Sequence, residues 1–185
     1  QEASIDLKVF YSKKTEQVRF DKDFGQEVTW DVPLTDGYLH ESIDAKEKTG
    51  RKKLITSIES FNPSALLVYG WNFDGHLAAM RHFHGSVPVW FRGDSTLLDP
   101  LPFWKRTLRK ISLTWVYRFV DRAFYVGQAN KRYFLWCGLT EDQLTYAPHA
   151  VCNEFFVKDD EERQEEALQI RKDLGIDPLA TVFLF

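Results

Sequence analysis

Short apolar runs alternate along the chain with longer segments in which apolar residues recur at intervals of three and four. The runs at 65–69 and 87–91 contain no charged residue and are typical of strands that are covered on both faces. Six runs have the length and the residue types of strands; they lie at 7–11, 28–32, 65–69, 87–91, 122–126 and 144–147. A seventh, at 181–185, ends the sequence.

The intervening segments have the periodicity of helices that cover a sheet. We expect helices at 51–61, 73–84, 101–119, 130–137 and 159–174. Gly85, Gly138 and Gly175 follow three of them, where a left-handed residue commonly ends a helix. The longest helix carries one apolar stripe, which we expect to face the core: Leu101, Trp104, Leu108, Ile111, Trp115 and Phe119. The sequence therefore predicts an α/β fold with a Rossmann-like parallel sheet flanked by helices.

The composition narrows the class of protein. Of the 185 residues, 44% are apolar and 28% are charged, which is an ordinary globular composition. No apolar run reaches the ~18 to 20 residues of a membrane span, and the N-terminus does not resemble a signal peptide. With 24 basic and 27 acidic residues, we expect no nucleic-acid partner. Cys137 and Cys152 have neither zinc-site nor disulfide spacing, which indicates a cytoplasmic location.

Several motifs resemble family 4 glycosyltransferases, and the resemblance extends over nearly the whole chain. In that family a strand leads to Pro-Asn-Gly-Val-Asp, then to a Phe, a helix ending in Leu-Gly and the first strand of a second domain. The corresponding residues here are 138–139, 144–155, 171–176 and 181–185. Residues 20–34, 65–73 and 87–98 also look like a bacterial branch of the family. His149, Ala150 and Cys152 replace the usual Asn, Gly and Asp.

The resemblance implies the GT-B fold, in which two Rossmann-like domains face each other. Residues 1–158 would form the N-terminal, acceptor-side domain, incomplete at its start. Residues 159–185 would form the interdomain helix and the first strand of a truncated second domain. The full-length enzyme would be a retaining glycosyltransferase of bacterial polysaccharide biosynthesis. It would transfer a sugar from a nucleotide sugar, held by the missing domain, to a hydroxyl of a saccharide or lipid-linked acceptor. We expect no metal and no other cofactor, and no activity from this piece alone.

The resemblance also implies that an opening strand should precede residues 7–11 and lie in the centre of the sheet. Its absence would leave unpaired backbone groups on two neighbouring strands. We expect residues 181–185, or a strand from a second copy in a homodimer, to occupy that position.

Ligands of open α/β sheets bind outside the carboxyl ends of the strands. The candidate acceptor-binding residues there are Trp71, Asn72, Arg92, Asp94 and Ser95. The candidate residues of the interdomain cleft are Gly70, Gly93, Gly127, Gln128 and His149. Asp94 would accept a sugar hydroxyl, Arg92 would bind a phosphate and Trp71 would face a sugar ring. Alternatively, Arg92 and Asp94 pair with each other or cap the following segment, Asn72 only caps a helix and His149 donates to a loop carbonyl. No catalytic residue is predicted.

The helix at 101–119 carries a basic side, formed by Lys105, Arg106, Arg109 and Lys110. It is either the solvated side of a core helix or a peripheral contact with an anionic membrane. We favour the solvated side, because a helix that covers a sheet needs its apolar stripe for the core.

The sequence also bears on a metal site and on functions other than glycosyl transfer. His76 and His82 lie on opposite sides of a helix, which argues against a metal site together with His84. The rival to the enzyme is a non-catalytic Rossmann-like module that binds a small ligand or a protein. A dehydrogenase is disfavoured because no Gly-x-Gly-x-x-Gly follows a strand.

Overall fold

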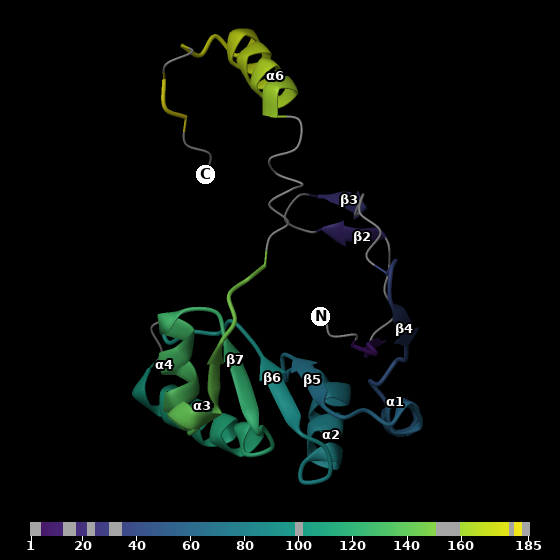
Figure 1. Cartoon of the computed structure of the whole chain (residues 1–185). Coiled ribbons are helices and arrows are strands. Elements are labelled where there is room, and N and C mark those ends of the chain that lie inside the picture. The colour runs from purple at the N-terminus through teal and green to yellow at the C-terminus, as the bar shows by residue number, and fades with distance from the viewer. Residues whose placement is uncertain are drawn as a thin grey trace. The chain divides into compact units, whose positions relative to one another are not determined.

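The computed structural model describes residues 5–12, 18–21, 25–29, 35–98, 102–150, 160–177 and 180–182. The chain divides into two compact units, Gln1–Pro148 and His149–Phe185. The second unit contains helix α6 (Asp160–Asp173), followed by Gly175 at a φ of 65° (Figure 1). This helix and its terminal glycine were predicted. In the ranges described, no helix is long and apolar enough to cross a bilayer.

The first unit is built on a parallel sheet of four strands in the order β5-β6-β7-β8. These strands are β5 (Leu66–Tyr69), β6 (Val89–Arg92), β7 (Arg122–Tyr125) and β8 (Leu144–Tyr146). All three pairings are parallel. Each strand lies within one of the predicted runs or extends it by one residue, so the prediction of an α/β fold with a Rossmann-like parallel sheet is confirmed.

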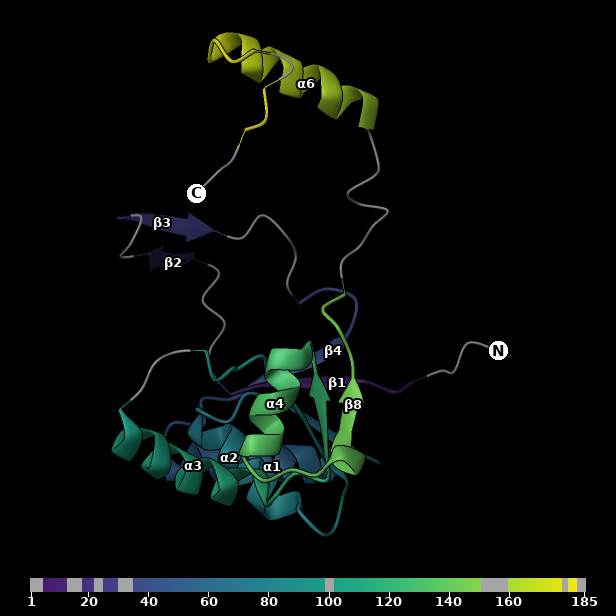
Figure 2. The same ribbon diagram turned by 90° about the vertical axis from the view of Figure 1, so that its left-hand side faces the viewer.

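Helices alternate with these strands along the chain (Figure 2). They are α1 (Lys48–Phe61), α2 (Asp74–Phe83), α3 (Phe103–Tyr117) and α4 (Gln128–Trp136), with a short 3₁₀ turn, η1 (Glu141–Gln143), before β8. Gly85 and Gly138 follow α2 and α4 at φ angles of 83° and 103°. They provide the left-handed conformation expected after a helix.

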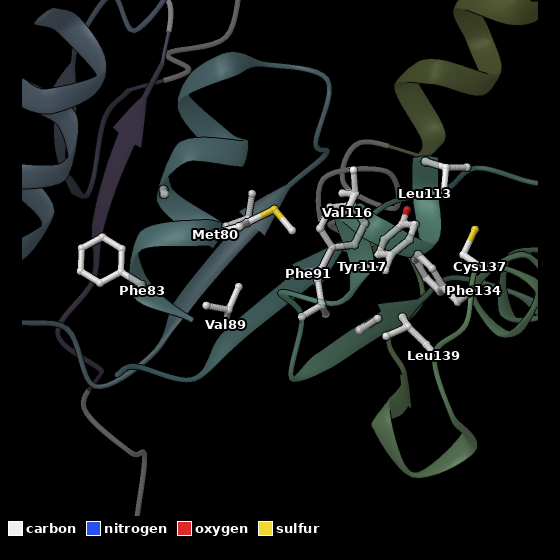
Figure 3. Close-up of a cluster of buried hydrophobic side chains, with 14 of the residues drawn as sticks. Met80, Phe83, Val89, Phe91, Leu113, Val116, Tyr117, Phe134, Cys137 and Leu139 are labelled. Atoms are coloured by element: carbon white, nitrogen blue, oxygen red, sulfur yellow. The ribbon is translucent and has the colours of Figure 1, made fainter. Parts of the chain in front are cut away.

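The core lies between one face of the sheet and the helices (Figure 3). Its centre is Phe91, whose ring centroid lies 5.1 Å from that of Tyr117 and 6.0 Å from that of Phe134. Both contacts are edge-to-face, a favourable arrangement for aromatic rings. Cys137 is also buried here, and burial raises the pKa of its thiol to about 12. The thiol is therefore protonated at neutral pH and packs as a small apolar group.

The other face of the sheet is partly open. Leu67, Tyr69 and Trp90 alternate with the buried residues of β5 and β6, and Tyr69 remains 61% exposed. The prediction that β5 is covered on both faces is therefore wrong for the part of the chain that the structure describes. A continuous apolar run cannot distinguish a strand that is buried on both faces from one that leaves an apolar face accessible.

Most of the predicted core stripe of α3 is exposed in the described part of the chain. Four of its six side chains lie at the surface, namely Trp104, Leu108, Ile111 and Trp115, whereas Leu113, Val116 and Tyr117 are buried. Phe119, at the end of the predicted stripe, does pack against the core, and Leu101 lies outside the described residues. The helix has two apolar sides, and the shorter one packs on the sheet. The prediction followed the longer stripe, because spacing alone does not show which apolar side is buried.

Two further strand pairs precede the main sheet. Strand β1 (Lys8–Tyr11), which was predicted, pairs in parallel with β4 (Leu39–Ser42). Strand β2 (Val18–Asp21) pairs in antiparallel fashion with β3 (Gln26–Thr29). Strands β2 and β4 were not predicted. Strand β4 has the polar sequence Leu-His-Glu-Ser and is mostly exposed, so it lacks the pattern of a buried strand. The predicted strand at 28–32 overlaps β3, and its last three residues lie outside the described ranges.

No strand among the described residues fills the position between β1 and β5. These two strands belong to separate sheets. Thr181 and Val182 adopt no strand, so the expectation that residues 181–185 pair into the sheet is not met at these two positions; 183–185 lie outside the described ranges.

The core predicts a contrast between two phenylalanines. Phe134→Ala removes a fully buried ring and should lower the free energy of unfolding by about 3–5 kcal/mol. Phe103→Ala changes a side chain that is 85% exposed and should change it by less than about 0.5 kcal/mol. Urea unfolding followed by tryptophan fluorescence measures both, because all six tryptophans belong to the first unit. Equal losses in the two variants would contradict the packing shown in Figure 3.

Candidate functional site at the carboxyl edge of the sheet

The loop after β5 places Gly70, Trp71 and Asn72 at the carboxyl end of that strand. Gly70 has a φ of 74°, a conformation in which glycine avoids strain. Trp71 is half-buried and packs against the core, and its predicted contact with a sugar ring stays a prediction. Asn72 is exposed, and Phe73 rather than Asn72 is the N-cap of α2, with no capping bond from a side chain. The predicted capping role of Asn72 is therefore wrong.

Arg92 ends β6 and links it to the end of β8. Its Nη2 donates a hydrogen bond to the carbonyl oxygen of Pro148 at 3.1 Å. Its guanidinium carbon lies 6.0 Å from the ring centroid of Tyr69, within reach of a cation–π contact. No ion pair joins Arg92 to Asp94, although both residues are described. The alternative that these two side chains pair with each other is therefore not found.

The loop after β6 presents Asp94 and Ser95 to solvent. It begins at Gly93, where a Cβ atom would lie 3.1 Å from Cε1 of Phe91. Glycine thus lets the backbone pass close to the central ring of the core. The loop directs the Asp94 carboxylate outward at the carboxyl edge, where it can accept hydrogen bonds from a ligand.

Asn130 fixes this loop to the neighbouring strand, and the sequence analysis did not single it out. Its Nδ2 donates to the carbonyl oxygen of Ser95 at 2.8 Å, and its Oδ1 accepts from the amide of Val126 at 3.1 Å. The side chain is only 2% exposed. The available signal was a polar residue on the apolar face of α4, since Asn130 is spaced three and four residues from the buried Tyr133 and Phe134.

Gly127 and Gln128 lie at the start of α4. Gly127 is the N-cap in an extended conformation, and its carbonyl oxygen accepts the hydrogen bond from the Lys131 amide. Gln128 is exposed. Both follow β7, at the same edge of the sheet as Arg92. His149 is exposed and belongs to the second unit, so its predicted place in a cleft between domains stays a prediction.

His76 connects the end of β1 to the end of β5. Its Nδ1 lies 3.1 Å from the carbonyl oxygen of Gly70, and its Nε2 lies 3.0 Å from Oγ of Ser12. A carbonyl oxygen only accepts hydrogen bonds, so Nδ1 carries the proton and Nε2 of the neutral ring accepts from the Ser12 hydroxyl. The imidazole therefore holds together the carboxyl ends of two strands that do not pair with each other.

Close packing makes this bridge possible. Gly75 is buried in the first turn of α2, and a Cβ atom there would lie 3.1 Å from Cβ of Ser12 and 2.6 Å from Cβ of Ala45. Glycine thus lets α2 approach the chain after β1. Burial lowers the pKa of His76, and the hydrogen bond to Gly70 only partly opposes this effect. The ring is therefore neutral at pH 7.

His82, the other histidine of α2, does not form a metal site with His76 in the described ranges. His82 pairs with Glu59 at 2.7 Å, on the opposite side of the helix from His76. No group of three histidine, cysteine, aspartate or glutamate side chains is placed to hold a metal ion within the residues that the structure describes.

Comparison with known proteins adds no family assignment. No protein-family model matches the chain, and no curated protein matches it. The carboxyl edge itself offers hydroxyl and carboxylate acceptors, one anchored guanidinium and aromatic rings.

The role of Asn130 predicts the effect of an isosteric change. Asn130→Asp replaces the Nδ2 donor by an oxygen that faces the Ser95 carbonyl, and we expect a loss of roughly 2–4 kcal/mol in the free energy of unfolding at pH 7. The loss should shrink at low pH, where a protonated carboxyl can donate to that carbonyl. Asn72→Asp, at an exposed site, is the matched control and should be nearly neutral. Urea titrations at several pH values measure both variants.

The His76 bridge predicts a pH dependence. The pKa of His76 is lower in the folded chain than the value of about 6.5 in the unfolded chain. The unfolded state thus binds more protons than the folded state at acidic pH. The contribution of the neutral His76 ring to the free energy of unfolding is therefore complete above about pH 6.5 and is lost as the pH falls through the folded pKa. His76→Gln should be less stable at pH 7.5 and should lose less of its stability between pH 7.5 and 5. The free energy of unfolding of both proteins is measured by urea unfolding at each pH. An equal loss in the two proteins between pH 7.5 and 5 would contradict the neutral His76 bridge.

Proposed function

We propose that the chain is the acceptor-side part of a retaining glycosyltransferase, which binds the saccharide or lipid-linked saccharide that receives the sugar. The observation that carries the proposal is the arrangement around Arg92. Its guanidinium is anchored by Pro148 and Tyr69, beside the exposed Asp94 and Ser95. A carboxylate next to fixed donors and aromatic rings is a suitable surface for sugar hydroxyls.

The anchoring explains how Arg92 would act. One N–H group bonds Pro148, and in the described part of the chain no other hydrogen bond of the guanidinium is found. The remaining N–H groups would be available for an acceptor hydroxyl or a phosphate. The buried Asn130 supports the same surface, because its side chain holds the backbone of Ser95 in place. The transferred sugar and its nucleotide would be held by a second domain, as the resemblance to family 4 glycosyltransferases implies.

A glycan array tests the proposal. The chain should bind a subset of immobilised saccharides, and Arg92→Ala and Asp94→Asn should each weaken binding by about 10-fold or more, because each removes hydrogen bonds in which one partner is charged. Nucleotide sugars should not compete for this surface. The matched controls Arg132→Ala and Asp36→Asn change exposed residues of the same types outside the candidate site and should bind normally.

Two results would speak against the proposal. Binding that is equal for the Arg92 and Asp94 variants and their controls would exclude this edge as the acceptor surface. An absence of binding to any glycan by the folded chain would favour the non-catalytic module.

A further inference from the structure

Helix α3 presents an apolar stripe to solvent. Its members Trp104, Leu108, Ile111 and Trp115 recur at intervals of four, three and four. Ile111 is 65% exposed and Trp115 is 42% exposed. Phe103, at the start of the helix, is 85% exposed. Soluble surfaces rarely collect two tryptophans and two aliphatic side chains on one helix side, and such a patch generally marks a contact with another body.

The stripe is not required for the core of the first unit. At 3.6 residues per turn, it is centred about half a turn away from Leu113, Val116 and Tyr117. Those three side chains are buried, and they pack toward Phe91 and Phe134 (Figure 3). Within the described residues, the helix is therefore attached by one side and leaves the opposite side exposed from Trp104 to Trp115.

The charge around the stripe has a single sign. From residue 102 to residue 120 the chain contains no acidic residue and carries five cations, Lys105, Arg106, Arg109, Lys110 and Arg118. Three of them lie over the rings of Tyr133 and Trp136 in α4, away from the stripe: Arg106, Arg109 and Lys110. The same helical geometry places Lys105 on one flank of the stripe and Arg118 on the other. Arg81 of α2 adds a further cation, 5.5 Å from the ring centroid of Trp115. Since the whole chain has a net charge of −3, this positive charge is local.

We propose that the exposed side of α3 docks on an anionic lipid bilayer. Tryptophans and aliphatic residues would enter the boundary between head groups and acyl chains, and Lys105, Arg118 and Arg81 would contact lipid phosphates. A single convex helix side suits a planar surface. A second copy of this chain suits it less, because a symmetric contact would bring like charges together. The docking does not depend on glycosyl transfer.

Flotation with lipid vesicles tests the proposal. The chain should associate with vesicles of phosphatidylcholine and phosphatidylglycerol, remain unbound with phosphatidylcholine alone and dissociate as the salt concentration rises. The double variant Leu108→Ser with Ile111→Ser should lower the partition coefficient by about 10-fold or more. The double variant Lys105→Glu with Arg118→Glu should lower it by a similar factor.

Matched variants control for general effects of polarity and charge. Leu39→Ser alters an exposed leucine of β4, and Lys52→Glu with Lys53→Glu reverses two exposed charges of α1; both should float like the unaltered chain. Equal flotation with neutral and anionic vesicles would overturn the proposal, as would full binding by the Leu108 and Ile111 variant. A dimer in sedimentation equilibrium without lipid, abolished in that variant, would instead identify a second copy as the occupant.

Discussion

The packing of Phe91 determines the arrangement of the first unit. The ring lies at the centre of the sheet and meets Tyr117 of α3 and Phe134 of α4 edge to face. These two rings also contact each other at 5.6 Å, so one aromatic cluster fixes both helices against β6. Side chains alternate along a strand, and the residue after Phe91 must therefore point to the other face. The core thus fixes on which face of the sheet Arg92 lies, next to Tyr69 on the adjacent strand.

Polar bridges at the carboxyl edge extend this order to the loops. Asn130 holds the loop after β6, Arg92 holds the end of β8, and His76 joins the ends of β1 and β5. One partner in each bridge is a backbone carbonyl oxygen. Every residue carries this group, so the bridge depends on where the backbone lies and not on the type of residue. These bridges orient the strand ends without using the carboxylate of Asp94, which remains outward.

The sequence predicted the strands of the main sheet and the helices between them because these elements bury apolar residues at regular spacing. It did not predict β4, whose Leu-His-Glu-Ser sequence lacks such a pattern, nor which side of α3 is buried. The candidate edge followed from the rule that ligands bind at the carboxyl ends of parallel strands. The partners of Arg92, His76 and Asn130 could not be predicted, because each lies on a different element that only the fold brings near.

The topology relates the exposed side of α3 to the candidate edge. Strands β6 and β7 are parallel, so α3, which connects them, runs back along the sheet with its first turn at the carboxyl edge. If α3 lies flat on a bilayer, the strands lie roughly in the membrane plane and the carboxyl edge opens along the surface. Arg92 faces away from α3, on the order of 15 Å above the lipid head groups, given the thickness of a helix and of a packed layer. A hydroxyl attached directly to a lipid head group would not reach it. A lipid carrying several sugar units would reach it. If this edge binds an acceptor, as proposed above, the geometry favours a lipid-linked saccharide over a simple lipid.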